Sequence, residues 1–344
     1  MAERFAWYVD DLDPKLASIR YRVLKPLAEL QQIGFPIELY DPAKGPAAYR
    51  AVIFSKCQSK HGLDVFRSVK AAGGRVVYDI CDNLFAAHRA GRASKSRLSR
   101  ACRMLCEADA LTFSTSVLQR QIESEVDGLC AMRIVVPDTL DTEDDEPGIP
   151  GRASRRSLRR LDDFLRTNDK ALHAIWFGNS LGKVAGLAHL SRSVRRLEDF
   201  SSRQPITLTV MSNSRLSYLR QSWRWRIPSH YVPWSLELSR TVVARHRLSV
   251  IPVEHNDYTA GKTLNRPATA LLAGLAVIAD PIPSYTELAA FIELADWQRG
   301  LQEAAEWTGD LKNRIAGGQA HLKQRYSAEA VANYWIALLC EITA

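Results

Sequence analysis

Short apolar runs alternate with amphipathic stretches along the first 140 residues. The apolar runs predict strands at 5–9, 36–40, 51–54, 75–80, 110–113 and 133–136. Several of these runs are apolar at every position, which is typical of parallel strands that helices cover on both faces. The amphipathic stretches predict helices at 16–30, 63–72, 97–108 and 117–126. Because Pro26 lies inside the first of these stretches, that helix either begins at Pro26 or kinks there.

A second series of the same kind follows from about residue 170. It predicts strands at 174–177, 206–211, 231–233, 249–253 and 276–279, and helices at 183–190, 240–246, 263–273 and 285–294. The chain closes with an amphipathic stretch at 327–342, for which Ser327 is a suitable N-cap. The pattern therefore predicts an α/β protein of two domains, each with a parallel sheet, facing each other across a cleft at the carboxyl ends of the strands.

The segment between the two series differs from both in composition. Residues 141–146 read DTEDDE, prolines and glycines fill most of 147–151, and RASRRSLRR at 152–160 carries five arginines. This segment is the best candidate for a linker. The stretch from Arg152 to Arg160 has two interpretations: a solvated surface segment, or a basic helix that contacts an anionic membrane or substrate.

Composition and charge narrow the classes of protein. A chain of 344 residues is expected to form about two domains. Its 46% hydrophobic and 24% charged residues are ordinary for a globular protein. The formal net charge of +8, from 46 basic and 38 acidic residues, favours acidic partners. Since no helix-turn-helix, zinc or RNA-binding motif accompanies this charge, specific binding of nucleic acid is not expected.

Neither export nor a membrane span is expected. The start, MAERFAWYVDD, lacks the apolar core flanked by a basic end that a signal peptide needs. The longest apolar run, 268–279, has 12 residues, whereas a span needs about 20. Six cysteines in so long a chain do not make a disulfide framework, and Cys102 and Cys106 are expected to be buried. We therefore expect a cytoplasmic protein.

The segment 261–285, GKTLNRPATALLAGLAVIADPIPSY, is the most informative part of the chain. It predicts a loop, a helix, a glycine turn, a buried strand and a second loop. Lys262 and Arg266 are four residues apart and fall on one face near the helix start, where free N–H groups and the helix dipole favour a phosphate. Either the two side chains bind such an anion, or both point into solvent.

The same segment resembles the donor-binding part of retaining, nucleotide-sugar-dependent glycosyltransferases of the GT-B fold, which have two Rossmann-like domains. In that family a helix leads through a glycine turn into a strand, as in AGLAVIAD at 273–280. In some bacterial polysaccharide enzymes of the family 4-like group the helix begins K-x-x-N-R, as at Lys262, Asn265 and Arg266. Other pieces follow in the family's order: VVYDICDNLF at 76–85, ADALTFSTSVLQRQI at 108–122, VVPDTLD at 135–141, IWFGNSLGKVAGLAHL at 175–190 and RLSVIPVEHN at 247–256.

One departure from the family concerns a pair of glutamates. Many retaining members carry E-x7-E, in which the second glutamate, five residues before the glycine of the turn, holds the nucleotide ribose. Thr269 stands at that position here, and Gly261 stands at the position of its partner. Glu254, in the preceding loop, is the expected substitute. The departure leaves catalytic competence open.

The resemblance implies roles for individual residues. Donor binding falls to Gly178, Asn179, Lys183, Val232, Trp234, Glu254, Lys262, Asn265 and Arg266. Catalysis falls to Asp79, Asp82, Lys262 and Arg266, and acceptor binding falls to Arg20, Arg22, Asp79 and His88. The residues themselves allow other roles: Asp82 or Asn83 as a helix N-cap, His88 as a packing residue, Arg20 and Arg22 as solvated side chains, and the aromatic residues around Trp234 as core.

The resemblance implies a glycosyltransferase that moves a sugar from a nucleotide-sugar donor to a bacterial cell-surface glycan or glycolipid. It implies retention of configuration, with no metal and no other cofactor. The alternative is a catalytically inactive scaffold of the same fold that binds glycans or partner enzymes. The expected domains are 1–150 for the acceptor and 151–325 for the donor, with a helix at 326–344 packing back on the first domain. The arginines from Arg152 to Arg160 are the expected peripheral contact with the inner face of a membrane.

Overall fold

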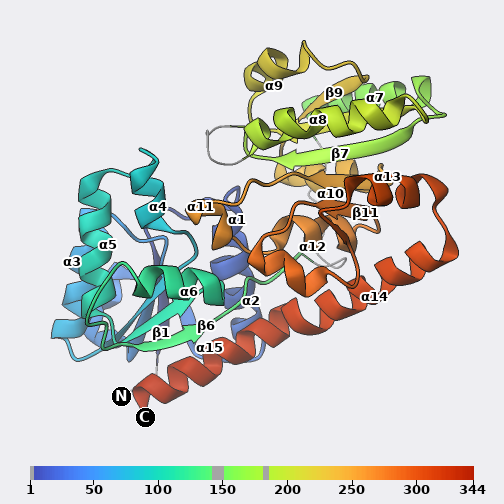
Figure 1. Ribbon diagram of the computed structural model, residues 1–344. Coiled ribbons are helices and arrows are strands. Elements are labelled where there is room, and N and C mark those ends of the chain that lie inside the picture. The colour runs from blue at the N-terminus through green and yellow to red at the C-terminus, as the bar shows by residue number, and fades with distance from the viewer. Residues whose placement is uncertain (1–3, 142–150, 181–185) are drawn as a thin grey trace. The chain divides into compact units, whose positions relative to one another are not determined.

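The chain folds into two compact units. The computed structural model describes residues 4–141, 151–180 and 186–344. The first unit comprises Met1–Leu140, Ala260–Thr263 and Gln324–Ala344, and the second comprises Asp141–Thr259 and Leu264–Lys323. Each unit is built on a sheet with helices packed against it (Figure 1).

In the part of the chain that the structure describes, the first unit contains a six-stranded parallel sheet. Its strands are β1 (Phe5–Val9), β2 (Ile37–Leu39), β3 (Ala51–Ser55), β4 (Arg75–Ile80), β5 (Ala110–Phe113) and β6 (Met132–Val135), in the order β2-β1-β3-β4-β5-β6. β3 and β5 are buried along their whole length, which explains why their sequences are apolar without alternation. The predicted parallel sheet is confirmed.

Both faces of this sheet are covered. On one face, α2 (Lys25–Gln32) and α15 (Ala328–Thr343) form one apolar cluster with β1 and β3, in which Trp7 meets Trp335 edge to face at 4.8 Å. On the other face, α3 (Lys60–Ala71) packs Phe66 against Phe54. α15 begins after Ser327, whose side chain accepts a hydrogen bond from the Ala330 N–H, so the predicted N-cap is confirmed. The other helices after β4 and β5 are α4 (Leu84–Arg89), α5 (Lys95–Glu107) and α6 (Ser116–Glu123).

The helical segment after β1 contains an irregular turn. α1 (Ala17–Ile19) passes through a π-helical turn, Arg20–Leu24, into α2, and the Lys25 N–H bonds to the Arg20 carbonyl five residues back. Pro26 has no N–H with which to continue the ordinary ladder. The helical segment therefore runs through Pro26 rather than beginning there, and its wide turn places Arg22 in the interior.

Counting only the described residues, the second unit also contains a six-stranded parallel sheet. Its strands are β7 (Leu172–Gly178), β8 (Ile206–Ser212), β9 (Ser229–Pro233), β10 (Leu248–Ile251), β11 (Ala276–Ala279) and β12 (Glu293–Leu294), in the order β12-β11-β10-β7-β8-β9. The prediction of two α/β domains with parallel sheets is therefore confirmed.

The helices after residue 151 agree less well with the prediction. They are α7 (Arg152–Thr167), α8 (Leu187–Ser201), α9 (Arg215–Ser222), α10 (Leu236–Val243), α11 (Asp257–Ala260), α12 (Asn265–Leu272), α13 (Trp297–Glu306) and α14 (Gly309–Tyr326). The predicted helix at 285–294 is wrong, because a 3-10 helix ends at Leu288 and β12 then pairs with β11. The arginine-rich stretch 152–160 is helical and forms the first half of α7. Residues 142–150 of the predicted linker lie outside the described residues.

The structure also bears on the predictions about a membrane span and about the cysteines. In the described residues, no helix combines the length and the apolar character that a membrane crossing requires. All six cysteines are free. Cys102 is half-buried and Cys106 is exposed, so the prediction that this pair is buried is wrong.

Candidate functional site

Each sheet reverses its strand order at one point. In the first sheet, β1 lies between β2 and β3, and in the second, β7 lies between β8 and β10. The loops that leave the carboxyl ends of such neighbouring strands run in opposite directions and leave a crevice, which is where open α/β sheets bind ligands. The residues that follow β1 and β3, and those that follow β7 and β10, are therefore candidates for a site.

A pocket of about 450 Å³ lies at the first of these crevices, and we name it the β1–β3 pocket. Its volume is within the usual range of small-molecule sites. It is lined by Asp10, Asp11, Leu16, Ser18, Ile19, Lys56, Gln58, Ser59, Arg97 and Arg100. The Asp10 carboxylate accepts hydrogen bonds from the Gln58 N–H at 2.6 Å and the Ser59 N–H at 2.7 Å, so it braces the loop before α3.

Two arginines of α5 give the β1–β3 pocket a cationic side. Arg97 and Arg100 are three residues apart and therefore share one face of the helix. Arg97 donates to Gln58 Oε1 from Nη2 at 2.6 Å, and Arg100 donates to the Gln58 carbonyl from Nε at 2.6 Å. These bonds fix both guanidinium groups at the pocket and occupy one edge of each. The remaining N–H groups suit an anionic group on a ligand.

Asp82, a predicted catalytic residue, lies between two lysines. Its carboxylate oxygens are 2.5 Å from Lys56 Nζ and 2.5 Å from Lys262 Nζ. Burial alone would raise the pKa of Asp82, but the two ammonium groups outweigh it and hold that pKa well below its usual range. Asn83, not Asp82, is the N-cap of α4, because its side chain accepts the Ala86 N–H. Asp82 is thus an ionised carboxylate with two cationic neighbours.

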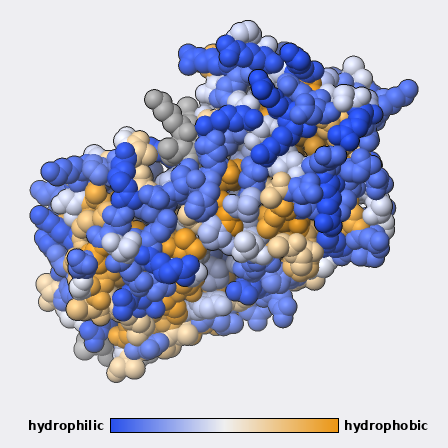
Figure 2. All heavy atoms as spheres, in the orientation of Figure 1, coloured by the Kyte–Doolittle hydropathy of each residue, from blue (hydrophilic) through white to orange (hydrophobic). Residues whose placement is uncertain are grey.

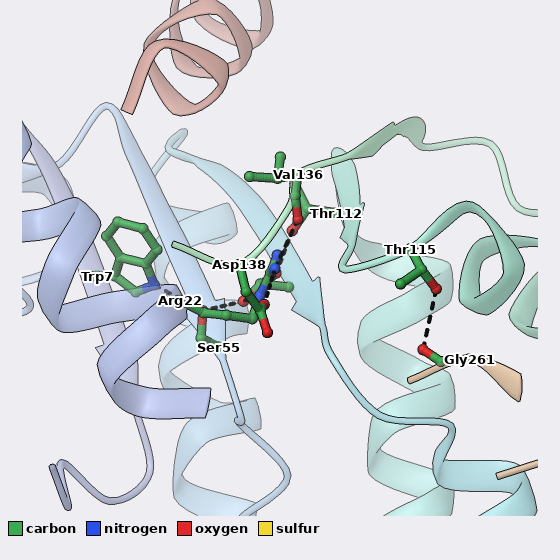
Figure 3. Close-up of polar contacts among 9 residues, drawn as sticks. Trp7, Arg22, Ser55, Thr112, Thr115, Val136, Asp138 and Gly261 are labelled. Carbon is green, nitrogen blue, oxygen red and sulfur yellow. Dashed lines mark hydrogen bonds and ion pairs between the residues drawn. The ribbon is translucent and has the colours of Figure 1, made fainter. Parts of the chain in front are cut away.

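Arg22 and Asp79, both predicted to bind the acceptor, form a buried ion pair instead. Figure 3 shows Arg22 with two of its other partners, Asp138 and Val136. Arg22 is 1% exposed and Asp79 is 3% exposed. Arg22 donates to the Asp79 carboxylate at 2.5 Å from Nη2 and at 2.9 Å from Nε. Its Nη1 donates to Asp138 at 2.9 Å and to the Val136 carbonyl at 2.8 Å. Both side chains are therefore engaged within the protein, and their contact with an acceptor stays a prediction.

Hydroxyl groups from neighbouring strands complete the network around Asp79. Ser55 in β3 and Thr112 in β5 each donate to the Asp79 carboxylate at 2.7 Å, and Trp7 Nε1 donates to Ser55 Oγ at 2.8 Å. Burial works against the charge on Arg22, but the carboxylates of Asp79 and Asp138 together outweigh it and raise the pKa of Arg22. Asp79, in β4, therefore holds β3 and β5 through hydrogen bonds to its carboxylate, and Ser55 extends the network to Trp7 in β1.

In the second unit, Arg266 lies at the end of β7. A Cβ atom on Gly178 would be 3.6 Å from Arg266 Cζ and 3.2 Å from the Trp176 ring, so the guanidinium packs where Gly178 has no side chain. Arg266 is the second residue of α12, whose first N–H groups favour an anion. Its Nη1 is buried and lacks a hydrogen-bond partner among the described residues. Buried donors are nearly always paired in proteins, so this nitrogen indicates a ligand acceptor.

Further charged side chains gather after β10. Glu254 Oε1 accepts from Arg192 Nε at 2.6 Å, and the Glu254 N–H donates to His189 Nδ1 at 3.2 Å. Because Nδ1 accepts, a neutral His189 carries its proton on Nε2, which lies 3.7 Å from Glu254 Oε2. Burial lowers the pKa of His189; Glu254 opposes that shift, while Arg192 and Arg266 reinforce it. The crevice of the second unit thus combines Arg266 with a neutral, buried imidazole.

The two positions of the family's glutamate pair differ in their surroundings. A Cβ atom on Gly261 would lie 2.7 Å from Gln121 Oε1 and 3.3 Å from Leu118 Cβ, so a longer side chain there requires a rearrangement. Thr269 donates its hydroxyl to the Asn265 carbonyl at 2.8 Å within α12. Glu254, the predicted substitute, is half exposed after β10, and its contact with a donor stays a prediction.

The other predicted donor residues are dispersed. Val232 is fully buried in β9, two strands away from β7, and its contact with a donor stays a prediction. Trp234 follows β9, and its backbone N–H donates to the Ser212 carbonyl at 2.9 Å. Asn179 directly follows β7, and Asn265 begins α12. Lys183 lies outside the described residues.

The other predicted acceptor residues make local contacts. Arg20 donates from Nη1 to the Pro14 carbonyl at 2.9 Å and stacks on the Tyr21 ring at 4.8 Å. His88 Nδ1 is 2.7 Å from the Ala93 carbonyl, which fits a packing role in the turn after α4. Lys262 and Arg266, predicted to share a helix face, are separated because α12 begins only at Asn265. Lys262 belongs to the short segment that clusters with the first unit.

Neither the apolar pattern nor the motifs predicted five of the charged residues at these crevices: Lys56, Arg97, Arg100, His189 and Arg192. Lys56 directly follows β3 and has a positive φ of 54°, which is unusual for a residue with a side chain. A polar residue directly after a buried strand was the available signal for Lys56. The other four lie on helices, and only the fold brings them to a crevice. In the described ranges, no three His, Cys, Asp or Glu side chains form a group that could hold a metal ion.

Comparisons with known proteins identify the fold. No family model matches the chain, and no curated protein matches it. The structure of HepE from Anabaena in complex with UDP matches with a TM-score of 0.68 at 15% identity, over 98% of this chain and 100% of that one. HepE in complex with UDP-glucose matches with a TM-score of 0.66 at 15% identity, over 98% and 99%. The α,α-trehalose-phosphate synthase (UDP-forming) of Burkholderia vietnamiensis matches with a TM-score of 0.58 at 12% identity, over 93% and 77%. The chain has the two Rossmann-like domains of the GT-B fold.

Proposed function

We propose that the protein is a glycosyltransferase that takes its sugar from a UDP-sugar. The crevice after β7 and β10 binds the nucleotide diphosphate, and the β1–β3 pocket binds the acceptor. The choice of donor is supported by neighbours of the same fold, since HepE is known in complex with UDP and UDP-glucose and the trehalose-phosphate synthase is UDP-forming.

The observation that carries the proposal is the unpaired nitrogen of Arg266. Nη1 is buried at the first turn of α12, beside Gly178 at the end of β7. A diphosphate at this point would accept from Nη1 and from the first N–H groups of the helix. As the glycosidic bond breaks, negative charge grows on the diphosphate, and a guanidinium already in place stabilises that charge. The chain needs no metal for this role.

Retention of configuration is the stereochemical course we propose. Inversion requires a general base of suitable pKa near the acceptor hydroxyl. Asp79 is buried in an ion pair, and two lysines hold the pKa of Asp82 far below neutrality. Neither predicted catalytic carboxylate is suited to take a proton, whereas the leaving phosphate of a retaining transfer can do so. Asp82 instead accepts a hydrogen bond from an acceptor hydroxyl.

The acceptor we propose is a cell-surface glycan or glycolipid that bears an acidic group. Arg97 and Arg100 present guanidinium N–H groups to the β1–β3 pocket, and Lys56 adds an ammonium group. A carboxylate or phosphate on the acceptor would pair with the arginines.

A second candidate function is a scaffold of the same fold that binds a UDP-sugar without transferring it. The surroundings of Gly261 favour this candidate, because a glutamate at this position of the family's pair would require Gln121 and Leu118 to shift. The two candidates differ in one observable: only the enzyme releases UDP from the donor in the presence of an acceptor.

Calorimetric titration with UDP, GDP, ADP, dTDP and CMP tests the proposal. We expect UDP to bind most tightly, and Arg266→Gln to weaken it at least roughly tenfold, as the loss of a charged hydrogen bond does. Arg203→Gln, an exposed arginine of the same unit, is the matched control and leaves the affinity unchanged. No measurable binding of any nucleotide overturns the proposal. Binding without UDP release from UDP-sugars and acidic glycan acceptors selects the scaffold.

A further inference from the structure

Helix α9 of the second unit presents large apolar side chains to solvent. Leu216 is 68% exposed, Leu219 is 48% exposed, and Trp223, directly after the helix, is 70% exposed. The inner face of the same helix is firmly packed: Tyr218 is buried and lies against the rings of Trp225 and Tyr231. The exposed side chains are therefore held outward by a fixed helix, and the alternative that the aromatic residues of this region form core is wrong for Trp223.

The three exposed side chains form one stripe. At about 100° per residue, Leu219, Trp223 and Leu216 fall within roughly 60° of each other around the helix axis. Trp223 has φ of −63° and ψ of −17°, so the helical geometry continues to it. The same geometry places Arg220 and Arg224 on one side of the stripe and Arg215 on the other. We name these six residues the α9 patch.

The stretch of sequence that carries the α9 patch is rich in arginine and contains no acidic residue. No Asp or Glu occurs between Asp199 and Glu237, whereas this stretch contains arginines at 203, 215, 220, 224 and 226. In the part of the chain that the structure describes, Arg215, Arg220 and Arg224 form no ion pair, and the Arg224 guanidinium stacks on the Trp223 ring at 4.5 Å. Figure 2 shows that hydrophilic residues dominate the visible face over α8 and α9.

We infer that the α9 patch binds the surface of an anionic lipid bilayer. An apolar stripe between two rows of cations is the pattern of a helix that lies in the interface, with leucines in the acyl region. Tryptophan prefers this interfacial depth, and arginine can extend its charge to lipid phosphates while its stem stays in apolar surroundings. The absence of acidic side chains from the surrounding sequence matches the negative charge of the lipid surface.

Other occupants fit this surface less well. A stable protein partner buries about 800 Å² on each side, and three apolar side chains on one convex helix supply only part of that area. The arginines of α7 were the expected membrane contact. Among the described residues, α7 exposes no large apolar side chain, so it can attract an anionic surface but has nothing to insert. The α9 patch supplies both insertion and charge.

Sedimentation with vesicles tests this inference on the full chain. We expect the protein to bind vesicles of phosphatidylcholine with one quarter phosphatidylglycerol, and to bind pure phosphatidylcholine far less. Leu219→Ser together with Trp223→Ser should weaken binding by roughly tenfold or more, since each removes one inserted side chain. Ile33→Ser, at a position 53% exposed in the first unit, is the matched control and should bind as the wild type does. Equal melting temperatures show that the variants are folded.

Charge variants separate α9 from α7. Arg220→Gln with Arg224→Gln should reduce binding to the anionic vesicles more than Arg155→Gln with Arg156→Gln does. The inference is overturned if the α7 variant alone loses binding, if the Leu219 and Trp223 variant binds like the wild type, or if these two residues instead mediate self-association in the absence of lipid. The assay contains no nucleotide, so its result is independent of the proposed glycosyl transfer.

Discussion

At the scale of single residues, burial decides which predicted site residues can touch a ligand. Asp79 and Arg22 were expected to face an acceptor, and both lie in the interior, with each carboxylate oxygen and each guanidinium nitrogen in a hydrogen bond. Asp82, three residues further along the chain, is partly exposed and lies between Lys56 and Lys262. Three positions along one strand and its loop thus separate a structural carboxylate from a candidate binding residue.

The Asp79 network makes a stability prediction. Asp79→Asn removes one of the two carboxylates that pair with the buried Arg22 guanidinium, and breaking a buried ion pair costs about 3–5 kcal/mol. We expect the free energy of unfolding in urea to fall by that amount. Asp11→Asn, at an exposed position of the β1–β3 pocket, should change it by less than about 0.5 kcal/mol. A loss below about 1 kcal/mol in the Asp79 variant would show that the network is not what holds these strands together.

His246 predicts a dependence of stability on pH. It is buried, and burial lowers its pKa from 6.5 to about 4. Above pH 6.5 the ring is neutral in the folded and the unfolded state, so it adds no pH dependence to the stability. Between pH 6.5 and 4 the unfolded chain binds a proton at this ring that the folded chain does not bind. Stability therefore falls as pH falls, by about 3 kcal/mol in total from this residue.

The test compares the wild type with His246→Gln by urea unfolding at pH 7.5 and pH 4.5. At pH 7.5 the variant should be less stable, because it loses the bonds of the ring to the Val242 carbonyl and to Thr209. At pH 4.5 the difference should shrink by about 2 kcal/mol, since glutamine does not titrate. A constant difference at the two pH values would mean that His246 is already protonated in the folded protein.

At the scale of elements, the pattern of apolar residues predicted the strands well because buried parallel strands leave a simple trace. The runs at 5–9, 75–80, 110–113 and 276–279 coincide with observed strands. The pattern did not predict α9, in which Tyr218 is the buried residue while Leu216 and Leu219 face outward. It also placed Lys262 on the helix with Arg266, although the helix begins three residues after Lys262. Sites assembled from different elements, such as Gln58 with Arg97 and Arg100, require the tertiary fold.

The segment before α12 makes the third prediction. It packs Gly261 against α6, where the Thr115 hydroxyl donates to the Gly261 carbonyl at 3.2 Å (Figure 3). Gly261→Glu, which restores one glutamate of the family's pair, should lower the free energy of unfolding by about 1–3 kcal/mol through overpacking. Gly309→Ala, where a Cβ atom meets nothing within 4 Å, is the control and should be neutral or slightly stabilising. A stable, more active Gly261→Glu variant would contradict the packing described for this segment.

At the scale of the whole molecule, two sheets with reversed strand order supply two crevices, and we propose that each binds one substrate. Hydrogen exchange can assign them separately. We expect UDP to slow exchange in peptides around Gly178, Glu254 and Arg266, and to leave the peptides around Gln58 and Arg97 unchanged. An acidic glycan should do the reverse. Protection by UDP at Gln58 and Arg97 alone would exchange the roles proposed for the two units.

A crystal structure of the protein with UDP tests most directly the proposal that Arg266 binds the nucleotide diphosphate. We expect the diphosphate to lie at the carboxyl end of β7, with a phosphate oxygen within hydrogen-bond distance of Arg266 Nη1 and close to the backbone of Gly178. UDP bound in the β1–β3 pocket, or bound elsewhere with Arg266 Nη1 still unpaired, would contradict it.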